Sequence, residues 1–398
     1  MDMKNKRVLV GVTGGIAAYK TADAVSMLVK TGAAVDVIMT KNATEFITPL
    51  TFETLTKRRC ITDTFARDFE FDVAHISLAK AADVILIAPA TANVIAKLAH
   101  GIADDMLTTT VLAAKCPKLV APSMNTAMLE NPITRDNIET LKKYGFEIIE
   151  PDSGRLACGD EGKGKLPSPE TLKECVLRHI AREKTLRGVR VTVTAGATQE
   201  ALDPVRFITN HSTGKMGYAV AREAMLRGAE VTLISGKTAL APPLFVNVRQ
   251  AVSAADMFQA VQEELPRTDI LIKTAAVADY RPKTFSESKI KKSGGEFSLP
   301  LERTEDILKW VGENRRPKLF VCGFSMETEN LLENSREKLL KKGLDMIAAN
   351  CLNTEGAGFG TDTNVITLIT RDGARELPLM SKADAAAELL DEIERRRG

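Results

Sequence analysis

The chain has 398 residues, which is more than one ordinary hydrophobic core accommodates, so two folded domains are expected. Its 54 Lys and Arg residues nearly balance its 52 Asp and Glu residues, and this excludes a general electrostatic attraction to nucleic acid or to anionic membranes. The apolar run at residues 8–12 is too short for a signal peptide, and no stretch is long enough to span a membrane. The six cysteines are scattered without a C-x-x-C pair, which indicates neither a zinc site nor a disulfide framework. We therefore expect a cytoplasmic protein that acts on small molecules.

Two parts of the chain begin with the same β–turn–α–β pattern. In the first, an apolar run ends at residue 12 and is followed by a Gly-bearing turn that ends at residue 15. A helical pattern then ends at residue 30, and a second apolar run ends at residue 39. In the second, the equivalent segments lie at residues 189–194, 196, 217–227 and 230–234. The pattern predicts an α/β protein with two doubly wound, three-layer domains, a flavodoxin-like or Rossmann-like domain followed by a Rossmann-like domain. We expect them at residues 1–188 and 189–398, with a helix at 168–184 before the boundary and a hairpin at 365–379 before a final helix from Lys382.

Small, hydroxyl and amide residues follow four apolar runs of the first half. Ligands of doubly wound sheets bind beyond the carboxyl ends of the strands, so these residues are the candidate site. Together they suit a phosphate over a helix N-terminus and a planar ring against backbone. A G-x-G-x-x-G motif is absent, which argues against a standard dinucleotide site. The candidate binding residues are Gly14, Gly15, Thr40, Pro89, Ala90, Thr91 and Asn93, with Asn125 after a fourth run.

Five segments of the first half resemble the phosphopantothenoylcysteine decarboxylases, which are flavoproteins that carry FMN. They are GVTGGIAAYK at 11–20, AHISLAK at 74–80, PATANVIAKLAHGIADDMLTTT at 89–110, PSMN at 122–125 and SGRLACG at 153–159. The resemblance covers most of residues 6–166. It implies that the cofactor is FMN and that the candidate binding residues named above bind it. In this family the substrate thiol is first oxidised to a thioaldehyde, which accepts the electrons released with carbon dioxide.

The resemblance also implies catalytic roles for three residues. His75 assists the oxidative step, Asn125 holds the substrate carboxylate, and Cys158 returns a proton from a flap over the site. Taken singly, His75 would more often be a structural histidine, Asn125 a helix cap and Cys158 a core filler. The chain departs from the family at Leu129, where an aromatic residue is usual, and in the flap at residues 165–170, where Lys-Leu replaces Arg-Met.

The second half contains residues suited to amide formation driven by a nucleotide triphosphate. Such a site must hold triphosphate charge, a metal and a carboxylate together. Asp279 follows an apolar run and is the expected Mg²⁺ ligand, and Lys289 lies in a basic loop with Lys291, Lys292 and two glycines. Lys338 and Lys342 lie four apart on a predicted helix and present two ammonium groups on one face, although charged runs are usually only solvated. The STGKMG stretch at 212–217 lacks the spacing of a P-loop.

These segments resemble the bacterial, CTP-using phosphopantothenate-cysteine ligases. The matching segments are TAGATQEALDPVRFITNHSTGKMG at 194–217, AAVADYRPK at 275–283, KIKK at 289–292, GFSMETEN at 323–330 and the KLLKKGLD helix at 338–345. The resemblance implies that Lys289 serves formation of an acyl-cytidylate and that Asn210 serves its conversion to product. It implies that the CTP site consists of Ala275, Asp279, Lys289, Glu305, Asp306, Ile307, Leu308, Phe324, Lys338 and Lys342, where Glu305 stands in place of the usual proline.

The two resemblances follow the order of a fused bacterial enzyme of coenzyme A synthesis. They imply CTP-dependent joining of 4'-phosphopantothenate to cysteine, and then FMN-dependent decarboxylation to 4'-phosphopantetheine. They further imply a homo-oligomer with FMN near a subunit interface. Two other interpretations remain, a nicotinamide-dependent Rossmann oxidoreductase and a non-catalytic flavin-binding regulatory protein. The missing glycine fingerprint disfavours the first, and the presence of His75, Asn125 and Cys158 disfavours the second.

Overall fold

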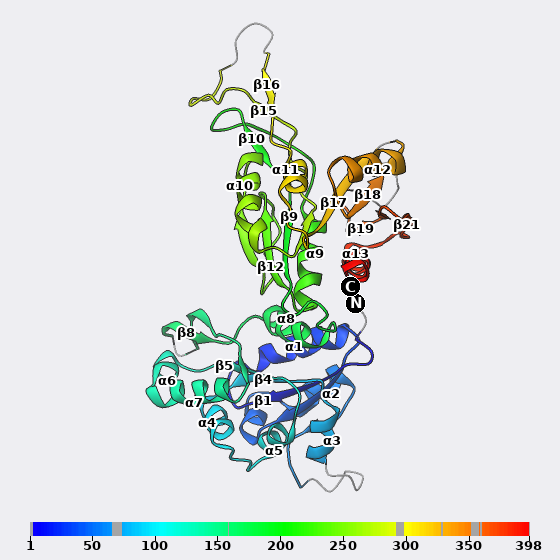
Figure 1. Cartoon of the computed structure of the whole chain (residues 1–398). Coiled ribbons are helices and arrows are strands. Elements are labelled where there is room, and N and C mark those ends of the chain that lie inside the picture. Colours follow the sequence, from blue (N-terminus) through cyan, green and yellow to red (C-terminus); the bar gives the residue numbers. More distant parts are fainter. Residues whose placement is uncertain are drawn as a thin grey trace. The chain divides into compact units, whose positions relative to one another are not determined.

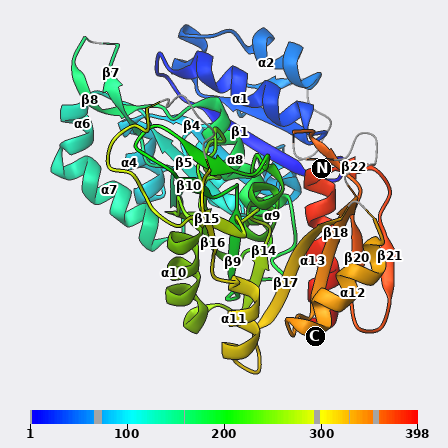
Figure 2. The same ribbon diagram turned by 90° about the horizontal axis from the view of Figure 1, so that it is seen from above.

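The computed structural model describes residues 3–65, 74–157, 159–291, 298–327, 329–351, 358 and 360–397. The chain divides into two compact units, Met1–Arg182 and Glu183–Gly398 (Figures 1 and 2). This division lies close to the boundary expected between residues 188 and 189, which stays a prediction. No helix in the described part of the chain is long and apolar enough to cross a membrane.

The first unit is built on a parallel sheet. Its elements in chain order are β1 (Arg7–Val12), α1 (Ala18–Lys30), β2 (Ala34–Met39), the 3₁₀ helix η1 (Lys41–Glu45), α2 (Pro49–Thr56), β3 (Cys60–Ile61), α3 (Ala74–Ala81), β4 (Val84–Ala90), α4 (Ala92–His100), α5 (Met106–Ala113), β5 (Lys118–Pro122), α6 (Thr126–Glu130), α7 (Pro132–Lys143), β6 (Glu147–Ile148), β7 (Asp152–Arg155), β8 (Glu161–Lys165) and α8 (Pro169–Ile180). The strand order β3-β2-β1-β4-β5-β6, with every neighbour parallel, confirms the expected doubly wound fold. The order reverses between β1 and β4, which is where such folds bind ligands.

Helices cover both faces of this sheet, as continuous apolar strands require (Figure 2). Helices α1, α2 and α8 pack on one another, whereas α3, α4, α5 and α7 form a second group. The second group buries Ile95, Leu107 and Ile138 against β1, β2 and β4. Helix α8 begins as expected, because the Ser168 side chain accepts a hydrogen bond from Thr171 N before a proline at the first helical position. It ends at Ile180, four residues earlier than the apolar pattern predicted.

The β7–β8 hairpin corresponds to the flap expected from the sequence. It is held against the segment after β5, because Met124 N donates to Gly164 O at 3.1 Å and Thr126 Oγ1 donates to Lys163 O at 2.9 Å. Gly164 has φ of 141°, and a Cβ atom there would lie 2.2 Å from Met124 O. Only glycine allows this close approach. The hairpin is therefore fixed next to the carboxyl ends of β4 and β5.

The second unit contains a mixed sheet. Its elements are β9 (Arg190–Ala195), β10 (Gln199–Ala201), β11 (Phe207–Thr209), α9 (Lys215–Leu226), β12 (Glu230–Ser235), β13 (Asn247–Gln250), α10 (Ala254–Glu264), the 3₁₀ helix η2 (Leu265–Arg267), β14 (Ile270–Lys273), β15 (Tyr280–Pro282), β16 (Leu301–Arg303), α11 (Ile307–Asn314), β17 (Phe320–Glu327), α12 (Leu331–Lys341), β18 (Met346–Cys351), β19 (Thr363–Asn364), β20 (Thr367–Ile369), β21 (Ala374–Glu376), β22 (Met380–Ser381) and α13 (Lys382–Arg397). The eight-stranded sheet has the order β13-β12-β9-β14-β17-β18-β20-β21. Its first six strands are parallel, while β20 and β21 form the expected hairpin and run antiparallel.

Close packing of α9 on this sheet depends on one glycine. A Cβ atom at Gly217 would lie 2.4 Å from Thr274 Oγ1 and 2.5 Å from the Ala195 Cβ atom. The N-terminus of α9 therefore lies directly over the ends of β9 and β14, which are the two strands between which the strand order reverses. Helices α9 and α13 pack together, and α10, α11 and α12 contribute to a separate core with the sheet. The packing of α9 on the sheet therefore places its N-terminus at the point where ligands of such folds bind.

Candidate functional sites

The first unit has a cavity of about 670 Å³ at its topological switch point. It receives Gly14 and Gly15 from the end of β1, Thr91 from the end of β4 and Asn125 from the end of β5. The hairpin closes another side with Arg155, Leu156, Gly164 and Lys165. The remaining lining residues are Ile16, Ala17, Tyr19, Lys20, Ala92, Ser123, Met124, Met128, Ala157 and Leu166. Its size and its largely apolar lining are typical of a cofactor or small-molecule site.

Hydrogen bonds fix the loops at the base of this cavity. The buried Thr13 Oγ1 donates to Pro89 O at 2.7 Å and accepts from Thr91 N at 3.1 Å. Thr21 Oγ1 on α1 donates to Ala88 O at 2.9 Å, which ties the first turns of the helix to β4. The first turns of α1 and α4 thus meet at one edge of the sheet, and their free backbone N–H groups suit an anion.

Two observations indicate that these residues fit FMN. A Cβ atom at Gly14 would lie 2.5 Å from the Asn42 Cβ atom, so any larger side chain would fill this part of the loop. Thr40 Oγ1 is buried at the end of β2 and has no hydrogen-bond partner among the described residues. A buried hydroxyl without a partner costs free energy unless a ligand or water satisfies it. Small loop residues, a free hydroxyl and an apolar cavity match a phosphate joined to a planar ring.

The structure brings together only part of the predicted flavin set. Gly14, Gly15 and Thr91 line the cavity, and Pro89 lies next to Gly15. Ala90 is fully buried in the core. Thr40 and Asn93 do not line the cavity, and the sequence pattern could not separate these from the lining residues because all of them follow apolar runs.

The three predicted catalytic residues of this unit have different surroundings. Asn125 lines the cavity, where its Nδ2 donates to Asp160 Oδ2 at 3.0 Å and its Oδ1 accepts from Ala127 N at 2.8 Å. His75 lies in the first turn of α3 and does not line the cavity. Cys158 lies outside the described residues.

The second unit has two adjoining cavities at its switch point, of about 460 and 350 Å³. Lys273, Val277 and Asp279 line both. The larger cavity is also lined by Asn210, Ala275, Phe324 and Lys338, and the smaller one by Glu305, Asp306, Ile307 and Lys342. Of the remaining predicted residues, Leu308 is buried in the core and Lys289 is exposed and lines neither cavity.

The STGKMG segment lines the larger cavity, although it does not have P-loop spacing. Its Gly214 precedes α9 with φ of 80°, a left-handed conformation that favours glycine. The cavity is lined by all six residues of the segment, Ser212, Thr213, Gly214, Lys215, Met216 and Gly217. The N-terminus of α9 therefore faces the cavity and can bind phosphate through backbone N–H groups. A glycine between a strand and a helix was the signal that could have identified this segment.

The predicted lysine pair is divided between the two cavities. Lys338 Nζ donates to Glu327 Oε1 at 2.5 Å, whereas Lys342, which follows α12, lies 3.1 Å from Asp306 Oδ2. Asp306 also caps α11 by accepting from Lys309 N. Burial alone would raise the pKa of Asp306, but the hydrogen bonds from Lys309 N and Lys342 lower it below its ordinary value. Asp306 is thus a carboxylate that positions Lys342.

No cluster of three His, Cys, Asp or Glu side chains that could hold a metal occurs within the described residues. Asp279 is exposed at the rim shared by both cavities. A single carboxylate suits Mg²⁺ only together with nucleotide phosphates, as is common for this ion. Lys292 and the two glycines that follow Ser293 lie outside the described residues.

Lys273 was not predicted from the sequence, because it lies within an apolar strand, yet it lines both cavities. Its Nζ lies 3.4 Å from Ala275 O, at the long limit for a hydrogen bond. Burial lowers the pKa of Lys273 to about 8, and the ammonium of Lys342 acts in the same direction against the carboxylates of Asp306 and Asp279. An ammonium group in such a position is suited to a polyanionic ligand.

If CTP is the ligand here, as the resemblance found in the sequence implies, we expect Lys273→Met to raise KM for CTP about tenfold to hundredfold, because one charge-assisted hydrogen bond to phosphate is lost. In the wild-type protein, affinity for CTP should also fall as the pH rises through about 8, where the free side chain loses its proton. Initial rates of pyrophosphate release between pH 7 and 9 measure both effects. The same KM in both proteins would contradict a phosphate contact.

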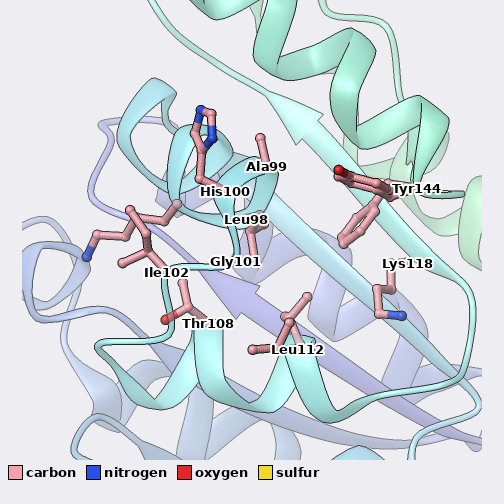
Figure 3. Close-up of a pocket in the computed structure, with 12 residues that line it drawn as sticks. Leu98, Ala99, His100, Gly101, Ile102, Thr108, Leu112, Lys118 and Tyr144 are labelled. Atoms are coloured by element: carbon pink, nitrogen blue, oxygen red, sulfur yellow. The ribbon is translucent and has the colours of Figure 1, made fainter.

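Another cavity of the first unit, of about 530 Å³, lies between the ends of α4 and α5 and the start of β5 (Figure 3). The lysine side chains that line this cavity already interact with other residues of the unit. Lys97 forms an ion pair with Asp104, and Lys118 lies over the Phe146 ring at 5.5 Å. His100 Nε2 lies 3.1 Å from Asn137 Oδ1. None of the predicted site residues lines this cavity, so it is not a candidate catalytic site.

Comparison with known proteins gives matches to both halves of the chain. Residues 1–181 match the family described as Flavoprotein, and residues 186–396 match the DNA/pantothenate metabolism flavoprotein C-terminal domain. The coenzyme A biosynthesis bifunctional protein CoaBC of Bacillus subtilis is 50% identical, over 98% of this chain and 97% of that protein. The protein of the same name from Escherichia coli is 40% identical, over 99% of this chain and 98% of that protein. The crystal structure of a CoaBC C-terminal domain, 45% identical, covers 54% of this chain and 98% of that chain with a TM-score of 0.47.

Proposed function

The chain belongs to the family of bifunctional coenzyme A biosynthesis proteins, and on that premise we propose a role for each cavity. The second unit joins 4'-phosphopantothenate to cysteine at the expense of CTP, and the first decarboxylates the product to 4'-phosphopantetheine. The observation that carries this proposal is that each unit has a cavity at its switch point. Residues expected for the reaction proposed for that unit line the cavity. Residues 1–188 and 189–398 are the proposed domains.

In the decarboxylase unit, Gly14, Gly15 and Thr91 would hold FMN, and Thr40 is a proposed phosphate ligand although it does not line the cavity. Bound FMN supplies a reversible two-electron acceptor. Asn125 binds the substrate carboxylate through its side-chain amide. Its Nδ2 group would then donate to the substrate instead of to Asp160 Oδ2. The hairpin excludes water, and Cys158 returns the proton to the decarboxylated product.

In the ligase unit, the α9 N-terminus and the lysines bind the CTP triphosphate with Mg²⁺ at Asp279. Lys289 stabilises charge as the phosphopantothenate carboxylate attacks the α-phosphate and pyrophosphate leaves, which gives an acyl-cytidylate. Asn210, whose Nδ2 donates to Ala276 O at 3.2 Å, positions the intermediate for attack by the cysteine amine. The products are phosphopantothenoylcysteine and CMP.

We further propose a cytoplasmic homo-oligomer. His75 and Lys289 carry expected catalytic roles but line none of the cavities found among the described residues of their own unit. Sites completed by residues of a neighbouring subunit account for this, and FMN then lies near a subunit interface. Sedimentation of the purified protein measures the assembly, and a monomer with full activity would contradict this proposal.

The experiment that tests the proposed function begins with the visible spectrum of the purified protein. Phosphopantothenate, cysteine, CTP and magnesium are then added, and carbon dioxide and pyrophosphate are followed together. A flavin spectrum with both products is the expected result. Carbon dioxide formed only from preformed phosphopantothenoylcysteine would restrict the activity to the first unit. A colourless, inactive protein would contradict both assignments.

Cys158→Ser tests the proton donor directly. A serine hydroxyl has a much higher pKa than a thiol and transfers its proton poorly. We therefore expect this variant to keep its flavin and to release carbon dioxide, but to accumulate an unsaturated thiol instead of phosphopantetheine. Absorbance and mass spectrometry of the products distinguish the two compounds. Phosphopantetheine formed at the wild-type rate would exclude this role.

A further inference from the structure

The cavity of the first unit carries three cations that the flavin assignment does not use. Lys20 comes from α1, Arg155 from β7 and Lys165 from β8, and all three line the cavity. None of the three forms an ion pair within the described residues, whereas Lys163 on the same strand as Lys165 pairs with Glu150 at 2.7 Å. Three separate elements therefore direct positive charge into one cavity.

The three cations differ in exposure, because Arg155 and Lys165 are exposed side chains of the hairpin whereas Lys20 is partly buried on α1. Lys20 is half-buried, and burial followed by the repulsion of Lys165 lowers its pKa, with Asp152 acting in the opposite direction. The Nζ atom of Lys165 extends back along the hairpin over Gly154, where a Cβ atom would lie 4.0 Å from it. Three cations that line one cavity, and that form no ion pair within the described residues, favour a multiply charged anion.

The other lining residues indicate which anion can bind there, because they combine one amide with several apolar side chains. Asn125 provides an amide at the end of β5, and apolar side chains of Ile16, Met124, Met128 and Leu156 contribute to the lining. The proposed substrate has a carboxylate at one end, an uncharged pantothenoyl chain and a phosphate dianion at the other. We propose that Lys20 and Lys165, together with Arg155, form the subsite for the terminal phosphate of the decarboxylase substrate.

This subsite rests on the proposed decarboxylase function and adds a basis for its specificity. A phosphate monoester can accept hydrogen bonds from two ammonium groups and a guanidinium at the same time. The enzyme should therefore prefer phosphopantothenoylcysteine over the same compound without phosphate.

The test compares both compounds with the variants Lys20→Gln and Lys165→Gln. Each variant should lower kcat/KM for the phosphorylated substrate about tenfold to hundredfold, which corresponds to the loss of one charge-assisted contact. The kcat/KM for the dephosphorylated compound should be unchanged. Lys163→Gln is the matched control, because its ammonium is paired outside the cavity, and it should change neither value. Lys165→Arg should restore most of the preference.

FMN also carries a phosphate, so flavin content must be measured in every variant. Loss of FMN from Lys20→Gln or Lys165→Gln would overturn the proposal, because the cations would then serve the cofactor. An equal loss of rate on both compounds would overturn it as well. Calorimetry with phosphopantetheine and pantetheine provides a readout without turnover. A wild-type protein that decarboxylates neither compound refutes the decarboxylase function, while equal phosphopantetheine binding by wild type and Lys165→Gln separately refutes the subsite.

Discussion

Replacing Lys289 with glutamine is expected to lower CTP-dependent pyrophosphate release about 10²- to 10³-fold, the usual cost of losing one group that stabilises transition-state charge. The residue is exposed, but the adjoining backbone is fixed. Ile290 N donates to Asp203 Oδ2 at 3.1 Å, and Ile290 O accepts from Arg206 Nη2 at 2.6 Å. The hydrogen bond from Arg206, with further backbone N–H groups, lowers the pKa of the buried Asp203, so this anchor stays charged at neutral pH.

The matched control for this prediction is Lys283→Gln, which removes an exposed lysine from the same connection between β15 and β16. It should leave pyrophosphate release unchanged. The decarboxylation of preformed phosphopantothenoylcysteine should be unaffected in both variants, because that reaction belongs to the other unit. If Lys289→Gln releases pyrophosphate as fast as Lys283→Gln, the segment is an ordinary solvated surface.

The fold of both units was predictable because buried parallel strands have continuous apolar sequences. The end of β1 at Val12 and the start of α13 at Lys382 agree with the expected positions, and the β20–β21 hairpin lies within the expected range 365–379. The helix before the unit boundary was expected to be longer than α8 is. Its end depends on local geometry that an apolar pattern does not encode.

Residues of the site were predictable where they follow a strand. Gly14, Gly15 and Thr91 meet because the carboxyl ends of neighbouring parallel strands share one edge of the sheet. Lys273 was not found, because a single lysine within an apolar run is indistinguishable from a strand residue at a sheet surface. Lys382 begins the final helix and yet lines the ligase cavity, where its Nζ donates to Gly358 O at 3.0 Å. Such long-range contacts depend on tertiary packing.

Replacing Asn125 with aspartate is expected to reduce decarboxylation at least about a hundredfold, because a second carboxylate would face the substrate carboxylate. Aspartate is an equally good helix cap, so the bond from Ala127 N that starts α6 should remain. The flavin spectrum should therefore be unchanged. In the free enzyme the new carboxylate would also repel Asp160, which accepts a hydrogen bond from Asn125 in the wild-type protein.

A second variant separates repulsion of the substrate from repulsion of the hairpin. Asn125→Asp combined with Asp160→Asn restores a hydrogen bond with donor and acceptor exchanged, so the hairpin should again be held over the cavity. The negative charge next to the substrate carboxylate remains in this double variant, and we expect it to stay inactive in single-turnover assays of carbon dioxide release. Recovery of activity would show that Asn125 acts only by fastening the hairpin. Persistent inactivity with a normal flavin spectrum supports direct binding of the carboxylate, because the hairpin contact and the helix cap are then both intact.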